Sequence, residues 1–159
     1  MEGPVSYDAD MGNLYEYFSA ADDETAAAAD GLVGGPSADG AFDTLFTKGI
    51  EPAVQISTLE GLLTGRSLDE IFDDPRWAKP VHPDTGAEHG VLTLNDAVAR
   101  ALAAADRARL AEVALPWSQT EEFWGQADPG HLTEFLVELS ALARRAADRG
   151  HRLYCWWSL

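Results

Sequence analysis

The chain has 159 residues, of which 46% are hydrophobic, and its 27 acidic and 11 basic residues leave a formal net charge of −16. This length and composition favour one folded domain with a buried core and argue against long disordered stretches. The negative charge disfavours binding to nucleic acid or to anionic membrane surfaces. The sequence also contains no run of about 18 apolar residues, the length that a membrane-spanning helix needs.

The sequence predicts two parts, a flexible N-terminal arm over residues 1–11 and a single α+β domain over residues 12–159. The arm lacks any hydrophobic period. In chain order, the predicted elements are a strand over 14–19, a helix over 24–30, a strand over 42–47, helices over 52–63 and 67–74, a strand over 91–94, helices over 96–105, 106–113 and 120–124, a long helix over 129–149, and a strand over 151–158.

Local signals mark where the helices of the first half begin and end. Asp22 or Asp23 can cap the helix over 24–30. A proline at position 52 suits the first turn of the helix after the second strand. Ser67 and Glu70 have the spacing of a capping box. The helix starts of this half are therefore predicted from single residues.

The second half carries similar signals. Asn95 and Asp106 are the predicted N-caps of two successive helices, and Pro116 is expected to interrupt the second. Asp128 and the proline after it begin the longest predicted helix, which Gly150 ends. The buried stripe of this helix is predicted to be Leu132, Phe135, Leu136, Leu139, Leu142, Ala143 and Ala146.

The C-terminal strand alternates between two faces. One face is predicted to carry Leu153, Cys155 and Trp157, and the other Arg152, Tyr154 and Trp156. Few strands separated by helices of uneven length predict the α+β class. We expect a small mixed or antiparallel sheet with several packed helices, a long penultimate helix and a C-terminal strand. A doubly wound parallel sheet is the alternative.

Several segments of the domain follow one register. Leu59–Gly65 ends its predicted helix with Leu-Leu-Thr-Gly, Leu92–Leu94 is followed by Ala97 and Val98, and Glu122–Trp124 follows a turn that contains proline. The last helix, glycine and strand carry Leu132, Phe135, Leu139, Leu142, Ala146, Ala147, Gly150 and Leu153. In this register, residues 12–159 resemble the YfbM-like family, a group of uncharacterised bacterial proteins.

The resemblance implies an α+β fold and a bacterial, cytosolic setting, and it implies no activity. The chain departs from the family pattern ahead of the Thr-Gly pair. There Ala53, Val54, Ile56 and Leu59 stand where the family is expected to carry a tryptophan and a histidine. A role of that histidine therefore cannot be transferred to this chain.

Aromatic and acidic residues in the second half are the candidate ligand-binding or partner-binding residues. They are Trp117, Glu121, Glu122, Trp124, Tyr154 and Trp156. Trp117 and Trp124 with the two glutamates could form a pocket with an acidic wall for a cationic or sugar-like ligand. The alternative is that the indoles pack in the core and the glutamates are helix surface charge.

The sequence predicts no catalytic residues, no metal site and no cofactor. His82 and His89, with Asp84 and Glu88 between them, match no zinc spacing. The single cysteine, Cys155, cannot form an intramolecular disulfide and is interpreted as a buried apolar residue. The glycine-rich stretch 31–40 lacks the lysine and hydroxyl residue of a phosphate-binding loop.

Two functions remain open. The first hypothesis is a non-catalytic, protein-binding module that recognises a basic protein, as small acidic immunity proteins do. The alternative is a small-molecule-binding protein or enzyme with the aromatic and acidic pocket. Mimicry of a nucleic-acid duplex is a third, weaker idea. The acidic N-terminus is not a secretory signal, so a cytoplasmic location is expected. The oligomeric state is not predicted.

Overall fold

A four-stranded antiparallel sheet organises the structure, a computed structural model that describes residues 14–82, 88–123 and 127–159. The strands, in the sheet order β2-β1-β4-β3, are β1 (Leu14–Ala20), β2 (Thr44–Lys48), β3 (His89–Thr93) and β4 (Arg152–Ser158). The α-helices are α2 (Asp23–Ala28), α3 (Gln55–Thr64), α4 (Leu68–Phe72), α5 (Asp96–Ala104), α6 (Arg107–Ser118) and α7 (Pro129–Asp148). Short 3₁₀ turns are η1 (Ala29–Gly31), η2 (Ala38–Gly40) and η3 (Glu121–Phe123).

This architecture confirms the predicted α+β class, with the long helix α7 as the penultimate element and β4 as the C-terminal strand. The sheet is antiparallel throughout, so the doubly wound alternative is wrong. The predicted arm lies outside the described residues. Within the described ranges, no helix is both long enough and apolar enough to cross a membrane.

Four predicted caps are confirmed. Asp22 accepts a hydrogen bond from the Thr25 N–H at 2.8 Å, and Ser67 forms a complete capping box with Glu70. The N-caps of α6 and α7 are Asp106 and Asp128, whose carboxylates accept from backbone N–H groups three and two residues ahead. These helices begin where they do because a side-chain oxygen satisfies an N–H group of the first turn.

Three predictions about helix ends differ from the structure. Helix α5 begins at Asp96 as predicted, but the Asn95 side chain forms no cap and instead donates to Glu60 Oε1 and to the Ile71 carbonyl, which joins three segments. Helix α3 begins at Gln55 rather than at residue 52. Helix α6 continues through Pro116 to Ser118, and Trp117, directly after the proline, is fully buried and donates its indole N–H to the distant Gln55 carbonyl. Each difference comes from contacts that short sequence windows do not contain.

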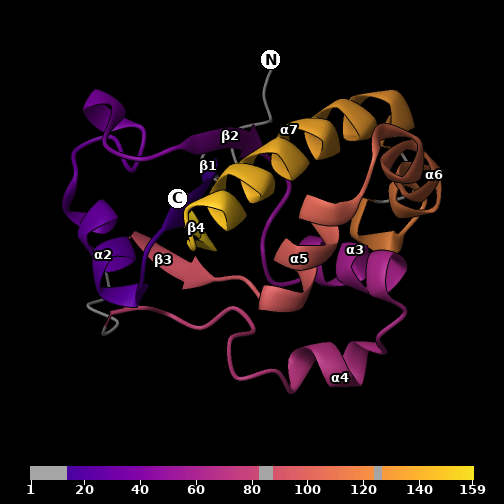
Figure 1. The fold of residues 1–159 in the computed structure, drawn as a ribbon, viewed down its shortest axis with the longest axis horizontal. Coiled ribbons are helices and arrows are strands. Elements are labelled where there is room, and N and C mark those ends of the chain that lie inside the picture. Colours follow the sequence, from indigo (N-terminus) through magenta and orange to yellow (C-terminus); the bar gives the residue numbers. More distant parts are fainter. Residues whose placement is uncertain (1–13, 83–87, 124–126) are drawn as a thin grey trace, which may run out of the picture.

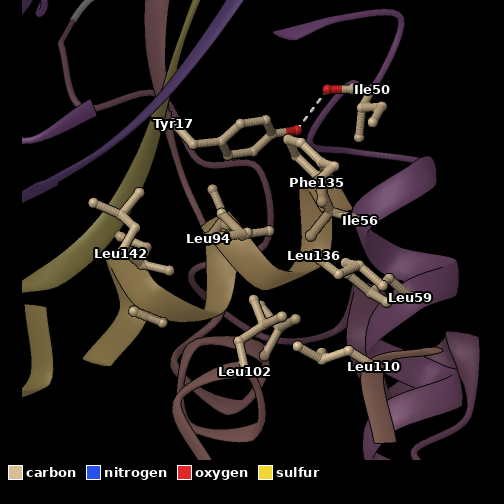
Figure 2. Packing of buried hydrophobic residues seen from close by; sticks show 14 of the residues in the cluster. Tyr17, Ile50, Ile56, Leu59, Leu94, Leu102, Leu110, Phe135, Leu136 and Leu142 are labelled. Carbon is tan, nitrogen blue, oxygen red and sulfur yellow. Dashed lines mark hydrogen bonds between the residues drawn. The ribbon is translucent and has the colours of Figure 1, made fainter. Parts of the chain in front are cut away.

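Helices α7 and α5 pack on one face of the sheet, and α3 and α6 pack against these two helices (Figure 1). Figure 2 shows their apolar side chains meeting those of β1 in one cluster. Its members include Tyr17, Ile56, Leu59, Leu94, Leu102, Leu110, Leu136, Leu139, Leu142, Leu153 and Cys155. The predicted stripe of α7 is buried in this cluster. Burial of this stripe anchors α7 on the sheet.

The opposite face packs against α2 and η1 in a second cluster. It contains Phe18, Ala26, Val91, Tyr154 and Trp156 among its buried members. The alternation predicted for β4 is therefore confirmed, since neighbouring residues of that strand enter different clusters. Both faces of the sheet are covered.

Candidate functional site

A groove of about 920 Å³ opens where β2 ends and where α3 and α7 begin. Its apolar lining comes from Tyr15, Ile50, Val54, Phe123, Ala127, Leu132 and Phe135. Its ionisable lining comes from Lys48, Glu51, Glu122, Asp128 and His131. The groove therefore combines an apolar floor with a charged rim, which is typical of a binding site.

The floor of the groove is held by a buried hydrogen bond. The Tyr17 hydroxyl donates to the Ile50 carbonyl at 2.6 Å, and the Tyr17 ring meets Phe135 edge to face at 6.0 Å (Figure 2). Gly49, just before Ile50, has a φ of 78°, which lets the chain turn out of β2 toward α3. Tyr17 thus fixes the end of β2 against α7.

The rim at α3 is tied together by Glu51 and Gln55. The Glu51 carboxylate accepts hydrogen bonds from the N–H groups of Ala53, Val54 and Gln55. The Gln55 side chain accepts from the Glu51 N–H at 2.6 Å and donates to the Glu122 carbonyl at 3.2 Å. This amide links the start of α3 to η3, so both sides of the groove keep a defined separation.

The rim at α7 also carries a carboxylate on a helix end. Asp128 accepts from the Gly130 N–H at 2.9 Å, and its other oxygen lies 3.5 Å from His131 Nδ1. Both helix N-termini at the groove are therefore already occupied by carboxylates. An anionic ligand finds a repulsive rim here, whereas a cationic group is attracted.

The structure places the predicted site residues in different environments. Trp117 is fully buried; its indole N–H donates to the Gln55 carbonyl at 2.9 Å, and its ring packs edge to face on Phe123. Glu121 is exposed, and Glu122 is half-buried in the groove lining. Trp124 lies outside the described residues. Trp117 supports the groove from beneath and does not line it.

Tyr154 and Trp156 lie far from this groove in the architecture. They belong to the second cluster, on the face of the sheet that α2 covers, and are 0% and 9% exposed. Trp156 packs so closely on Gly35 that a Cβ there would lie 2.9 Å from the indole. Both are packing residues in this structure, and they lie in a different cluster from Trp117.

Cys155 is fully buried in the first cluster, as its interpretation as an apolar residue requires. Burial raises the pKa of its thiol well above the ordinary value, and the hydrogen bond with Tyr17 only partly opposes that shift. The reactive thiolate is thus disfavoured. Cys155 is a packing residue.

The two loop histidines lie beside the carboxylate of Asp30, which no local sequence pattern marks. His89 Nδ1 lies 2.6 Å from Asp30 Oδ1, and His82 Nε2 lies 3.5 Å from Asp30 Oδ2. Among the described residues, no group of three or more histidine, cysteine or acidic side chains is arranged to hold a metal ion. Asp84 falls outside the described residues. Asp30 joins η1 to β3 through these contacts.

Sequence reasoning missed several residues that build the groove, among them Tyr15, Gln55 and His131. A signal existed for His131, which follows the predicted helix start at Asp128–Pro129. Nothing local marks Gln55, because its partner Glu122 is 67 residues away.

No protein-family model matches this chain, and no curated protein or solved structure is significantly similar to it. The resemblance to the YfbM-like family therefore stays a prediction that these comparisons do not test.

Proposed function

We propose that this chain is a non-catalytic binding module whose groove receives a cationic segment of a basic protein partner. The observation that carries the proposal is the groove itself, about 920 Å³, with three carboxylates and one lysine in its lining. The chain around it has a net charge of −16, which attracts basic proteins at long range.

The arrangement of the carboxylates supports a cation as the ligand group. Glu51 and Asp128 each cap a helix whose end supplies about half a positive charge, so each pair remains negative. Glu122 caps no helix among the described residues, and it is half-buried in the groove lining, next to Phe123 in the chain. A lysine or arginine side chain can place its stem on the apolar floor and its charge near Glu122.

The proposal of a non-catalytic role has its own support. Among the described groove residues, no hydroxyl or thiol is hydrogen-bonded to a histidine or a carboxylate. A nucleophile needs such a base within hydrogen-bond reach. His131 is paired with Asp128, but its side chain is 89% exposed at the rim. These features favour binding over chemistry.

A pair of charge-neutralised variants tests the proposal. Glu122→Gln with Asp128→Asn removes two groove charges, and asparagine retains the cap of α7. The matched control, Glu24→Gln with Asp148→Asn, removes two charges on α2 and at the far end of α7. The probe is a fluorescent octalysine peptide, whose affinity is measured by anisotropy at low and moderate salt.

We expect the groove variant to weaken octalysine binding by roughly fivefold or more, because each lost charge contact is worth about 1 kcal/mol. The control is expected to lose less than about twofold, since distant charges are screened. Equal losses in both variants would mean that attraction is diffuse and that the groove is not the site.

The apolar floor also supports the second candidate function, a small-molecule site. Tyr15, Phe123 and Phe135 offer aromatic surface that a cationic or sugar-like ligand could cover. A thermal-shift panel of metabolites distinguishes the two functions. A compound that stabilises the wild type and the control variant but not the groove variant would favour this alternative over the protein partner.

A further inference from the structure

Strand β2 is an edge strand of the sheet that the described residues form. It pairs only with β1 on its inner side, and no other strand of the described residues pairs with its outer side. The opposite edge is different, since Val81 N–H donates to the Val91 carbonyl and Thr93 N–H donates to the Lys79 carbonyl. Residues 79–81 thus cover β3, whereas within 14–82, 88–123 and 127–159 no strand pairs with the outer edge of β2.

The usual protections of an edge strand are sparse on β2. Proteins guard such edges with lysines, prolines or bulges, because unpaired N–H and C=O groups accept another strand. β2 has the sequence Thr-Leu-Phe-Thr-Lys, and its only charge is at the C-terminal end. Phe46, at its centre, is 53% exposed. The edge is therefore apolar where a pairing strand would contact it.

The open edge is continuous with the groove. Thr47 and Lys48 belong to β2 and also line the groove. Thr47 is paired with Tyr15 across the β1–β2 ladder, and Tyr15 lines the groove as well. A strand laid along β2 would therefore run on past Ile50 toward the carboxylates of Glu122 and Asp128.

We propose that an extended, lysine-rich or arginine-rich segment of the partner pairs with β2 as a fifth strand and extends a cationic side chain into the groove. This inference rests on the proposed function and adds the conformation of the bound segment. A second copy of this chain is the less suitable occupant, because two molecules of net charge −16 repel each other. Backbone pairing supplies affinity and the groove supplies charge selectivity.

Two peptides of equal charge test the mode of binding. The first is Lys-Thr-Val-Lys-Thr-Val-Lys, which can form a strand. The second has the same sequence with four consecutive central amides N-methylated, so neither of its edges can donate hydrogen bonds from its central residues. Affinity is measured by anisotropy, and amide hydrogen exchange is measured on Thr44–Lys48.

We expect the first peptide to bind the wild type roughly tenfold or more tightly than the methylated one, because several backbone hydrogen bonds are lost together. It should also slow amide exchange in β2. The variant Phe46→Lys should lose this preference, since a lysine guards the edge. Leu115→Lys is the matched control, at 52% exposure on α6, and should retain it.

The outcomes separate the two proposals. If both peptides bind with equal affinity and amide exchange in β2 is unchanged, strand addition is overturned. If in addition the Glu122→Gln, Asp128→Asn variant binds both peptides more weakly than the wild type, the proposed function still stands. If neither peptide binds the wild type, both proposals fail. If β2 becomes protected and the groove variant binds as the wild type does, strand addition stands and the electrostatic groove is rejected.

Discussion

The carboxylate of Asp23 links three segments through a small polar network. It accepts a hydrogen bond from the Tyr154 hydroxyl at 2.6 Å and pairs with the Arg76 guanidinium at 3.1 Å. The bond from Tyr154, with help from Arg76, lowers the pKa of Asp23. Burial, together with the bond to Asp23, raises the pKa of Tyr154 to about 12. The network thus favours a charged aspartate and a neutral tyrosine.

The destabilisation caused by Tyr154→Phe is expected to depend on pH. The pKa of Tyr154 is higher in the folded state than its unfolded value of 10.0, so the stabilisation from its hydroxyl is complete below pH 10 and is lost as the pH rises to about 12. The difference in free energy of unfolding between wild type and variant should therefore shrink over that range. Urea unfolding at neutral pH and at a series of alkaline pH values measures it.

The control is Phe18→Leu, because Phe18 stacks on Tyr154 at 5.6 Å but does not titrate. Its difference from the wild type should stay constant across the same pH range. If the difference in free energy of unfolding for Tyr154→Phe is also constant with pH, ionisation of the Tyr154 hydroxyl does not affect stability.

At the scale of elements, β4 joins the two layers through adjacent tryptophans. Trp156 packs on Gly35 on one face, and Trp157 packs on Gly90 of β3 in the ladder of the sheet. A Cβ at Gly90 would lie 2.9 Å from the Trp157 indole nitrogen. Absence of a side chain at position 90 thus allows the indole to lie against β3.

Gly90→Ala is expected to destabilise the protein by about 1–3 kcal/mol, the usual cost of an overpacked contact. The cost should be smaller in a Trp157→Leu background, because the smaller side chain leaves space for the new methyl group. Denaturant unfolding of the four proteins in this cycle measures the coupling.

Gly31→Ala is the matched control, since a Cβ at position 31 meets no atom within 4 Å. It should change the free energy of unfolding by less than about 1 kcal/mol. Additive costs of Gly90→Ala and Trp157→Leu would contradict the contact.

At the scale of the whole molecule, most arginines of the described residues form ion pairs with acidic side chains. The arginines in ion pairs are Arg66, Arg76, Arg107, Arg109, Arg145, Arg149 and Arg152. With 27 acidic against 11 basic residues, most carboxylates still have no basic counterpart. Like charges in the folded state repel each other, and this repulsion opposes compaction.

Added NaCl is therefore expected to stabilise the folded state. Raising ionic strength to about 0.5 M shortens the screening length to a few ångströms and should raise the free energy of unfolding by about 1 kcal/mol. Exposed ion pairs lose little by screening. Urea unfolding at several NaCl concentrations measures the effect, and the Glu24→Gln, Asp148→Asn variant should gain less. A fall in stability with salt would mean that the ion pairs outweigh the repulsion.

Local chemistry was enough to predict much of this fold. The caps at Asp22, Ser67, Asp106 and Asp128 were predictable because each carboxylate or hydroxyl acts within three residues. The two faces of β4 were predictable because side chains alternate along any strand. The start of α3 and the path of α6 through Pro116 were not, since distant contacts decide them.

For this protein, the sequence by itself determined the α+β class, most helix starts and the acidic balance, because propensity, capping and charge act locally. Only the tertiary structure decided where the groove lies. The Tyr17–Ile50 bond spans 33 residues and the Gln55–Glu122 bond spans 67, so no local pattern contains them. Burial of Trp117 was decided in the same way, since an indole suits a core or a surface equally until its neighbours are in place.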